Sequence, residues 1–136
     1  MSGSSRWLDH GLLALRVGIG GMFMAHGWPK LAGGAKSWAK LGGAMSHLGL
    51  DFWPTFWGFS AACAEFFGGM LIALGLLFKP ACGMLLATMA VAATMHVRTG
   101  DGVMGASHAI ELGIVFASLL LIGPGKYALA EKLGKS

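Results

Sequence analysis

Three charged residues lie inside long apolar stretches of this chain, and they constrain its fold more than any other feature. Arg16, Glu65 and Glu111 each occur in a stretch that is typical of a membrane-spanning helix. Moving a charge to bilayer depth costs at least about 2.5–3.5 kcal/mol, so a charge that is retained there is normally paired or functional. The sequence therefore predicts a small membrane protein built around buried ionisable groups.

The composition supports this location and argues against a nucleic-acid partner. Hydrophobic residues make up 55% of the 136 residues, and charged residues only 12%, about half their share in soluble domains. The net charge is +4, but the lysines and arginines are scattered and form no basic face. The length predicts a single domain over residues 1–136. Asp9, His10 and Arg16 interrupt any signal-peptide core, so the first helix is expected to remain as an anchor.

The apolar stretches predict an all-α fold, an antiparallel bundle of four transmembrane helices. The helices are expected near residues 8–27, 56–78, 81–96 and 107–123. Helices are favoured because a spanning segment must satisfy its own backbone in lipid. Small residues predict close packing on one face of the first helix; they are Ala14, Gly18, Gly21 and Ala25.

The segment between the first two helices carries a helical pattern of its own. Its apolar residues recur at spacings of three and four, at Trp38, Leu41, Met45 and Leu48. This predicts a short amphipathic helix near 36–48 that lies at the membrane interface and ends at Gly49. A small excess of Lys and Arg on one side favours both termini in the cytoplasm. The protein is expected to be a multi-pass protein of the inner membrane.

Histidines and one acid gather at one side of the predicted bundle. His26, His96 and His108 lie at helix ends that share this side of the membrane. Glu111 lies one turn into the fourth helix, and it is expected on the face of His108 because positions i and i+3 are neighbours. This grouping predicts a polar pocket or a proton path in that half of the bundle.

Arg16 and Glu65 are predicted to form a structural ion pair. At 1.5 Å per residue, Glu65 is expected about 13 Å deep and Arg16 about 15 Å deep. A buried pair of this kind fixes the register of two helices. We therefore expect Glu65→Gln to destabilise the fold, and Glu111→Gln to impair ligand binding or turnover instead.

These residue types suit the head group of a quinone or quinol. Histidine donates to a carbonyl oxygen, glutamate exchanges a proton, and aromatic rings stack on the head group. The predicted catalytic residues are Glu111, His26 and Glu65. The predicted quinone-binding residues are His26, His96, His108, Phe23, Trp28 and Trp57.

Metal and haem are less favoured cofactors. His26, His96 and His108 with a glutamate suit Zn, Cu or Fe, but they lie on different helices with no signature spacing. A b-type haem on His26 and His96 needs a large apolar slot, and nothing in the sequence marks one. A different alternative is a non-catalytic subunit or small-molecule carrier, in which the buried Arg, Glu and His groups serve packing and assembly.

Short motifs along nearly the whole chain resemble one family. Arg16 followed by FMAHGWPKL at 23–31 is similar to the R…F-x-x-H-G-x-x-K-L signature of the DoxX family. Glu65, FKPA at 78–81, and Glu111 with GPGKY at 123–127 resemble later motifs of that family. One departure is the tail, where Ala128-Leu129-Ala130 stands in place of S-L-D.

The resemblance implies a four-helix integral membrane protein. It also implies a link to quinol oxidase and thiosulfate:quinone oxidoreduction, or to oxidative-stress complexes, with family positions at Arg16, His26, Glu65 and Glu111. We predict a membrane subunit of a redox system, and a partner protein that supplies the electrons because the sequence has no haem, Fe–S or nucleotide motif. Whether this chain is itself a quinone-linked oxidoreductase, and whether it forms a homo-oligomer, is left open by the sequence.

Overall fold

The fold is built from helices. The computed structural model describes residues 3–132, and that range contains no strand. The long helices are α1 (Gly3–Ala32), α3 (Pro54–Leu74), α4 (Phe78–Arg98) and α6 (Ser107–Ile122). The short ones are α2 (Gly34–Gly42), the 3-10 helix η1 (Gly43–Leu48), α5 (Gly102–Gly105) and α7 (Leu129–Lys132). The predicted all-α class is confirmed.

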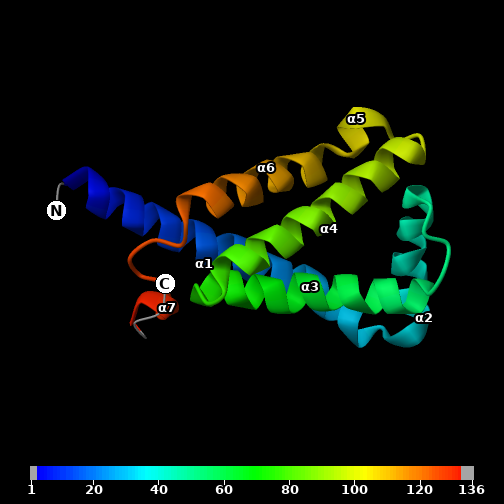
Figure 1. The fold of residues 1–136 in the computed structure, drawn as a ribbon, viewed down its shortest axis with the longest axis horizontal. Coiled ribbons are helices and arrows are strands. Elements are labelled where there is room, and N and C mark those ends of the chain that lie inside the picture. The colour runs from blue at the N-terminus through cyan, green and yellow to red at the C-terminus, as the bar shows by residue number, and fades with distance from the viewer. Residues whose placement is uncertain (1–2, 133–136) are drawn as a thin grey trace.

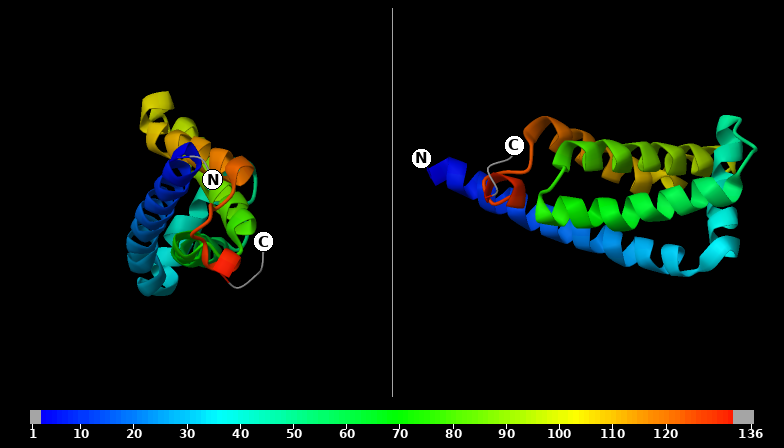
Figure 2. Two further views of the ribbon diagram at one scale, coloured as in Figure 1. Left: turned by 90° about the vertical axis from the view of Figure 1, so that its left-hand side faces the viewer. Right: turned by 60° about the horizontal axis from the view of Figure 1, so that its bottom comes forward.

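The long helices form two pairs that diverge toward one end of the molecule (Figure 1). α1 packs along α3 and α4 packs along α6, while the turn between α3 and α4 joins the pairs. The start of α1 and the short α7 lie toward this joined end (Figure 2). α2 and η1 stand at the opposite end, called the wide end below, where α2 contacts α3 and η1 contacts α3 and α4.

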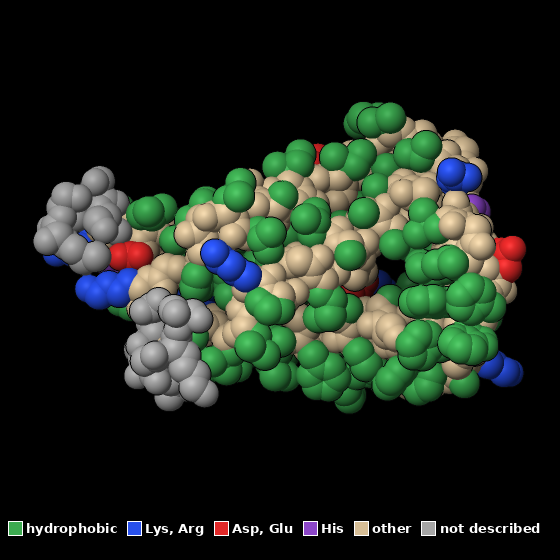
Figure 3. Space-filling view, viewed as in Figure 1, with side chains coloured by type: hydrophobic (Ala, Val, Ile, Leu, Met, Phe, Trp, Pro, Cys, Tyr) green, Lys and Arg blue, Asp and Glu red, His purple; other side chains and the backbone are tan. Residues whose placement is uncertain are grey.

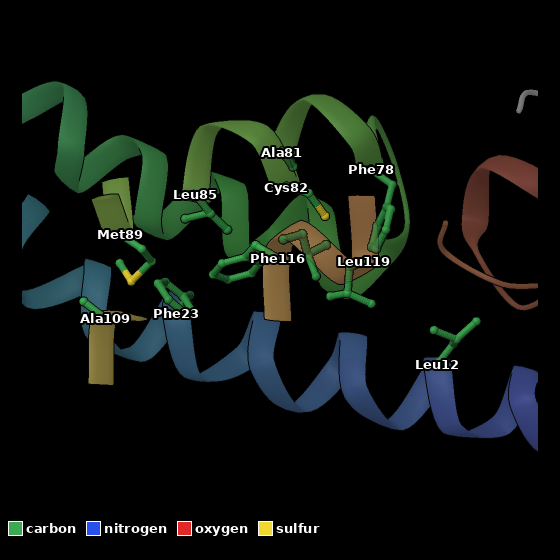
Figure 4. Close-up of a cluster of buried hydrophobic side chains, with 11 residues drawn as sticks. Leu12, Phe23, Phe78, Ala81, Cys82, Leu85, Met89, Ala109, Phe116 and Leu119 are labelled. Carbon is green, nitrogen blue, oxygen red and sulfur yellow. The ribbon is translucent and has the colours of Figure 1, made fainter. Parts of the chain in front are cut away.

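The apolar core lies where the two pairs meet (Figure 4). Leu85 and Met89 of α4 and Phe116 of α6 are buried there together with Ile72 of α3. Phe23 of α1 meets Phe116 edge to face, with 5.2 Å between the ring centroids, an arrangement that aromatic pairs prefer. This core joins the two pairs of helices.

α1 is longer than the helix predicted near 8–27. It continues through Pro29 and ends at Ala32. At 3.6 residues per turn, the extension places Lys30 one turn beyond His26 and two turns beyond Phe23. The three side chains therefore lie along one stripe of the helix, and the extension adds a basic group to it.

The boundary between α3 and α4 lies earlier in the chain than the boundary between the helices predicted near 56–78 and 81–96. Gly75 has a φ of 74°, the left-handed conformation in which a glycine ends a helix, so α3 stops before it. α4 has 21 residues and is as long as α3, so the short third helix expected from the sequence is wrong. Pro80 is tolerated because it lies in the first turn of α4, where its missing N–H has no partner within the helix.

The amphipathic segment near 36–48 occurs as two pieces, α2 and η1. α2 approaches α3 backbone to backbone. A Cβ on Gly42 would lie 1.6 Å from a backbone oxygen of α3, and one on Gly58 would lie 1.5 Å from the Trp38 oxygen. Only glycine fits at both positions, and this contact sets the wall of the wide end.

Two helices, α3 and α4, are long and apolar enough to cross a membrane by length and composition. α6 is apolar but has only 16 residues, about 24 Å at 1.5 Å each. The structure thus supports two of the four predicted spans, and crossings by α1 and α6 stay predictions.

Candidate functional site

An ion pair between Lys30 and Glu65 lies at the wide end. The Lys30 Nζ donates to both carboxylate oxygens of Glu65, at 2.8 and 3.0 Å. The side chain of Glu65 is 7% exposed and that of Lys30 is 38% exposed, so the lysine stem reaches inward to a buried acid. α1 and α3 approach closely here because Gly27 has no side chain: a Cβ would lie 2.6 Å from the Phe66 nitrogen.

A cavity of about 400 Å³ opens beside this pair, between α2, η1, α3 and α4. Its polar groups include Lys30, Glu65 and His96, and most of its wall is apolar, with three methionines: Met45, Met84 and Met95. Figure 3 shows a mostly apolar face with a hollow in which acidic and basic side chains are visible. Apolar walls with a few convergent polar groups are typical of small-molecule sites.

A smaller cavity of about 240 Å³ lies toward α1 and α6. Four residues line both cavities: Lys30, Glu65, Ala92 and His96. The ion pair and His96 therefore form the boundary between the two spaces. A ligand or a proton in either cavity can therefore contact Lys30, Glu65 and His96.

His96 bonds to an acid that follows it in the chain. Its Nδ1 lies 2.9 Å from Oδ2 of Asp101, in the turn between α4 and α5. This hydrogen bond with His96 is the main reason that the pKa of the exposed Asp101 lies below its ordinary value of 3.8. Asp101 is thus ionised at neutral pH and accepts a hydrogen bond from the ring.

The Arg16–Glu65 ion pair predicted from the sequence is wrong. Arg16 is buried, and its Nη1 donates to the backbone oxygens of Ala73 at 2.9 Å and Ile72 at 3.4 Å. The depths do not match because α1 extends to Ala32: Arg16 lies about 24 Å from that end, and Glu65 about 17 Å from the start of α3. Arg16 instead places its charge at the negative C-terminal end of α3.

Glu111 lies outside both cavities. The buried stripe of α6 includes Ala109, Phe116 and Leu119. At 100° per residue, Glu111 lies about 130° around the helix from the middle of that stripe, and its side chain is exposed on the outer face. His108 lies nearer the stripe and lines the smaller cavity. The structure therefore does not bring Glu111 to the other candidate residues.

The other predicted ligand-binding residues lie at the cavities, with one exception. Phe23, His26 and His108 line the smaller cavity, His96 lines both, and Trp57 lines the larger. Trp28 is 57% exposed and packs against Phe66, with 5.7 Å between ring centroids. Trp28 is therefore a surface residue at the level of the site.

Within residues 3–132, no group of three or more His, Cys, Asp or Glu side chains is arranged to hold a metal. His26, His96 and His108 share a cavity wall, but they do not gather as a ligand set. The metal alternative considered from the sequence therefore gains no support.

Lys30 and Asp101 are candidates that the sequence reasoning missed. A signal for Lys30 was present, because it stands four residues after His26 and continues the helical stripe. Asp101 had no such signal, because it lies in a turn, where side-chain periodicity is lost.

A family model described as DoxX matches residues 11–97. The match covers more than half of the chain, including Lys30, Glu65 and His96, and ends before Asp101. No curated protein and no solved structure matches the chain.

Proposed function

Because the chain belongs to the DoxX family, we propose that it is a membrane subunit of a redox system that binds a quinone or quinol beside the Lys30–Glu65 pair. Proteins of this family are membrane proteins linked to redox and thiosulfate:quinone processes. In this proposal a partner protein supplies the electrons. The proposed substrate site is the larger cavity.

The observation that carries the proposal is an ion pair with a buried acid on the wall of a largely apolar cavity. A quinone head group needs an apolar slot, hydrogen-bond donors for its two carbonyl oxygens, and a group that exchanges protons. The cavity volume of about 400 Å³ falls within the range of small-molecule sites. Trp57 adds a donor, since its indole nitrogen is buried with no acceptor in the described part of the chain.

The residues then take separate roles. A bound quinone supplies two-electron, two-proton redox chemistry. Lys30 and His96 offer N–H donors for its carbonyl oxygens, and Trp57 offers its indole N–H or ring face. Glu65 is buried and accepts or returns a proton, which is the ordinary role of a positioned carboxyl group in a dry site.

The proposal also places the long helices across the inner membrane in four antiparallel crossings, with both termini in the cytoplasm. Two internal cations of α1 bond to α3: Arg16 through Nη1 to backbone oxygens, and Lys30 to Glu65. The outer faces of α1 and α6 are largely apolar and expose Val17, Met22, Ile114 and Leu121. Such surfaces are favourable in lipid, and the exposed Glu111 lies only one turn inside α6.

The test is titration of a short-chain ubiquinone into the full-length protein in lipid nanodiscs, followed by calorimetry. We expect the wild type to bind, and Glu65→Gln and Lys30→Met each to weaken the affinity about tenfold, or about 1.4 kcal/mol. Glu111→Gln is the matched comparison, because it removes a carboxylate from the outer face of α6. We expect its affinity to equal that of the wild type.

Two outcomes contradict the proposal in different ways. A loss of affinity in Glu111→Gln, with none in Glu65→Gln, moves the site away from the larger cavity. A wild-type protein that neither binds the quinone nor co-purifies with one favours the alternative, a non-catalytic subunit or carrier that uses the Lys30–Glu65 pair for packing.

A further inference from the structure

Asp101 bonds to His96, one of the residues that line both cavities. His96 contributes to both cavity walls from the last turn of α4. Its Nδ1 is occupied by Asp101 Oδ2 at 2.9 Å. The second ring nitrogen, Nε2, is therefore the one left for a ligand or proton carrier in the cavities.

The turn after α4 holds Asp101 in this position. The Asp101 backbone nitrogen donates to the His96 oxygen at 3.0 Å, which closes the turn. The Thr99 hydroxyl lies 3.4 Å from the same carboxylate oxygen that bonds the ring. The backbone oxygen of Asp101 in turn accepts a hydrogen bond from the Gly105 backbone nitrogen of α5 at 3.2 Å. The carboxylate is thus fixed by its own loop, independently of α1 and α3.

We propose that Asp101 is a positioning residue for His96, because its carboxylate fixes the imidazole as the Nδ1–H tautomer and leaves Nε2 as a proton acceptor at the cavities. An ionised carboxylate only accepts hydrogen bonds, so the ring nitrogen that faces it must carry a hydrogen. The other nitrogen of a neutral ring then has a free lone pair. Fixing one nitrogen in this way sets what the other can do.

This inference deepens the proposed function and rests on it for the identity of the ligand. At the boundary between the cavities, the charged and titratable groups facing His96 are Lys30 and His26 from α1, Glu65 from α3 and His108 from α6. Glu65 is already paired with Lys30. His96 Nε2 is therefore the acceptor for a ligand hydroxyl proton, and the exposed Asp101 stabilises the imidazolium that results.

The test is the nitrogen NMR spectrum of ¹⁵N-histidine-labelled full-length protein in nanodiscs. The spectrum is recorded at about pH 8.5, above the usual titration range of histidine. Subtracting the spectrum of His96→Gln identifies the His96 signals among those of the five histidines. We expect the Nδ1–H tautomer in the wild type, its loss as the predominant form in Asp101→Ala, which removes the acceptor, and its retention in Asp101→Glu.

The control variant is Thr99→Ser, which keeps the hydroxyl that supports the carboxylate and should leave the tautomer unchanged. A wild-type ring that carries its hydrogen on Nε2, or an Asp101→Ala ring identical to the wild type, overturns the positioning role. This readout does not depend on quinone. If the Nδ1–H tautomer is found and no quinone binds, the proposed function fails and the role of Asp101 stands.

Discussion

At the scale of single residues, the uneven burial of Lys30 and Glu65 decides what each substitution does. Glu65 is almost fully enclosed, whereas Lys30 enters from a half-exposed position. Without Glu65, the lysine can turn its ammonium group back toward water. Without Lys30, the buried carboxylate has no cation to balance it and must become protonated or hydrated.

We therefore predict an asymmetric double-mutant cycle. Lys30→Met should lower the free energy of unfolding by about 1–3 kcal/mol, the cost of an unsatisfied buried charged group. Glu65→Gln should cost less, and adding it to Lys30→Met should recover part of the loss because the buried charge is gone. Unfolding of the three variants in detergent measures the cycle, with the exposed Lys36→Met as the control. Strictly additive losses would show that the two side chains do not interact.

A second prediction at this scale concerns the pH dependence of the His96–Asp101 contact. The pKa of Asp101 is held below 3.8, mainly by the hydrogen bond with His96. The stabilising contribution of a depressed carboxyl is present above 3.8 and is lost as the pH falls through the lower folded-state pKa. Carbon NMR of the Asp101 carboxyl should show a midpoint below 3.8, and His96→Gln should raise it part of the way back. An unchanged midpoint in that variant contradicts the contact.

At the scale of helices, glycines decide which faces meet. Gly20 of α1 lies against α3, where an added Cβ would be 2.4 Å from the Gly69 oxygen. Its neighbour Gly21 has nothing within 4 Å. The side of α1 that packs is therefore the side of Gly20 and Gly27, and the small-residue face predicted for α1 is exposed.

This gives a matched pair of substitutions on adjacent residues. Gly20→Ala should destabilise the protein by about 1–3 kcal/mol, as overpacking of a close contact does, since backbone atoms of α3 cannot move aside cheaply. Gly21→Ala should be neutral or stabilising by up to about 1 kcal/mol, because alanine favours the helix and meets no neighbour. Thermal unfolding of both variants in the same detergent compares them. Equal effects would contradict packing of α1 through the side of Gly20.

The bounds and packed faces of the helices could be predicted from the sequence only in part. Hydropathy located the four long helices, because apolar side chains mark them directly. It misplaced the end of α1 by several residues, since nothing in a hydropathy pattern forbids or requires a helix through Pro29. Because of that error, the depth of Arg16 was counted from the wrong helix end, and Lys30 was placed outside the helix. The outward position of Glu111 was missed for a related reason: the i, i+3 rule relates two residues to each other and does not say where the packed stripe lies.

At the scale of the whole molecule, the cavities lie at the wide end, and the start of α1 and α7 lie toward the joined end. Asp9 near the start of α1 accepts from the Lys126 nitrogen at 3.1 Å, which ties the segment after α6 to α1. The wide end instead contains the ion pair, His96 and both cavities. The joined end is thus held by the contact between Asp9 and Lys126, whereas side chains at the wide end surround open space.

In a membrane, this arrangement predicts which positions share a side. Cysteines introduced at Trp7 and Lys126 should react with an impermeant thiol reagent from the same side, and one at Met104 from the opposite side. All three side chains are exposed, and the native Cys63 and Cys82 are replaced by alanine to remove the background. Labelling of Trp7→Cys and Lys126→Cys from opposite sides would require an odd number of crossings and contradict the four-span proposal.

The separation of Lys30 and Glu65 along the chain has a consequence for biosynthesis. The partners are 35 residues apart, so at 5–20 residues per second the ribosome makes Glu65 about 2–7 s after Lys30. During that interval the lysine has no acid to meet and must keep its ammonium group hydrated at the membrane surface. It can turn inward only when α3 has been inserted beside α1. In the four-span proposal, the ion pair therefore closes only after insertion of α3, and a nascent chain halted before Glu65 would hold α1 in a shallower position than the finished protein does.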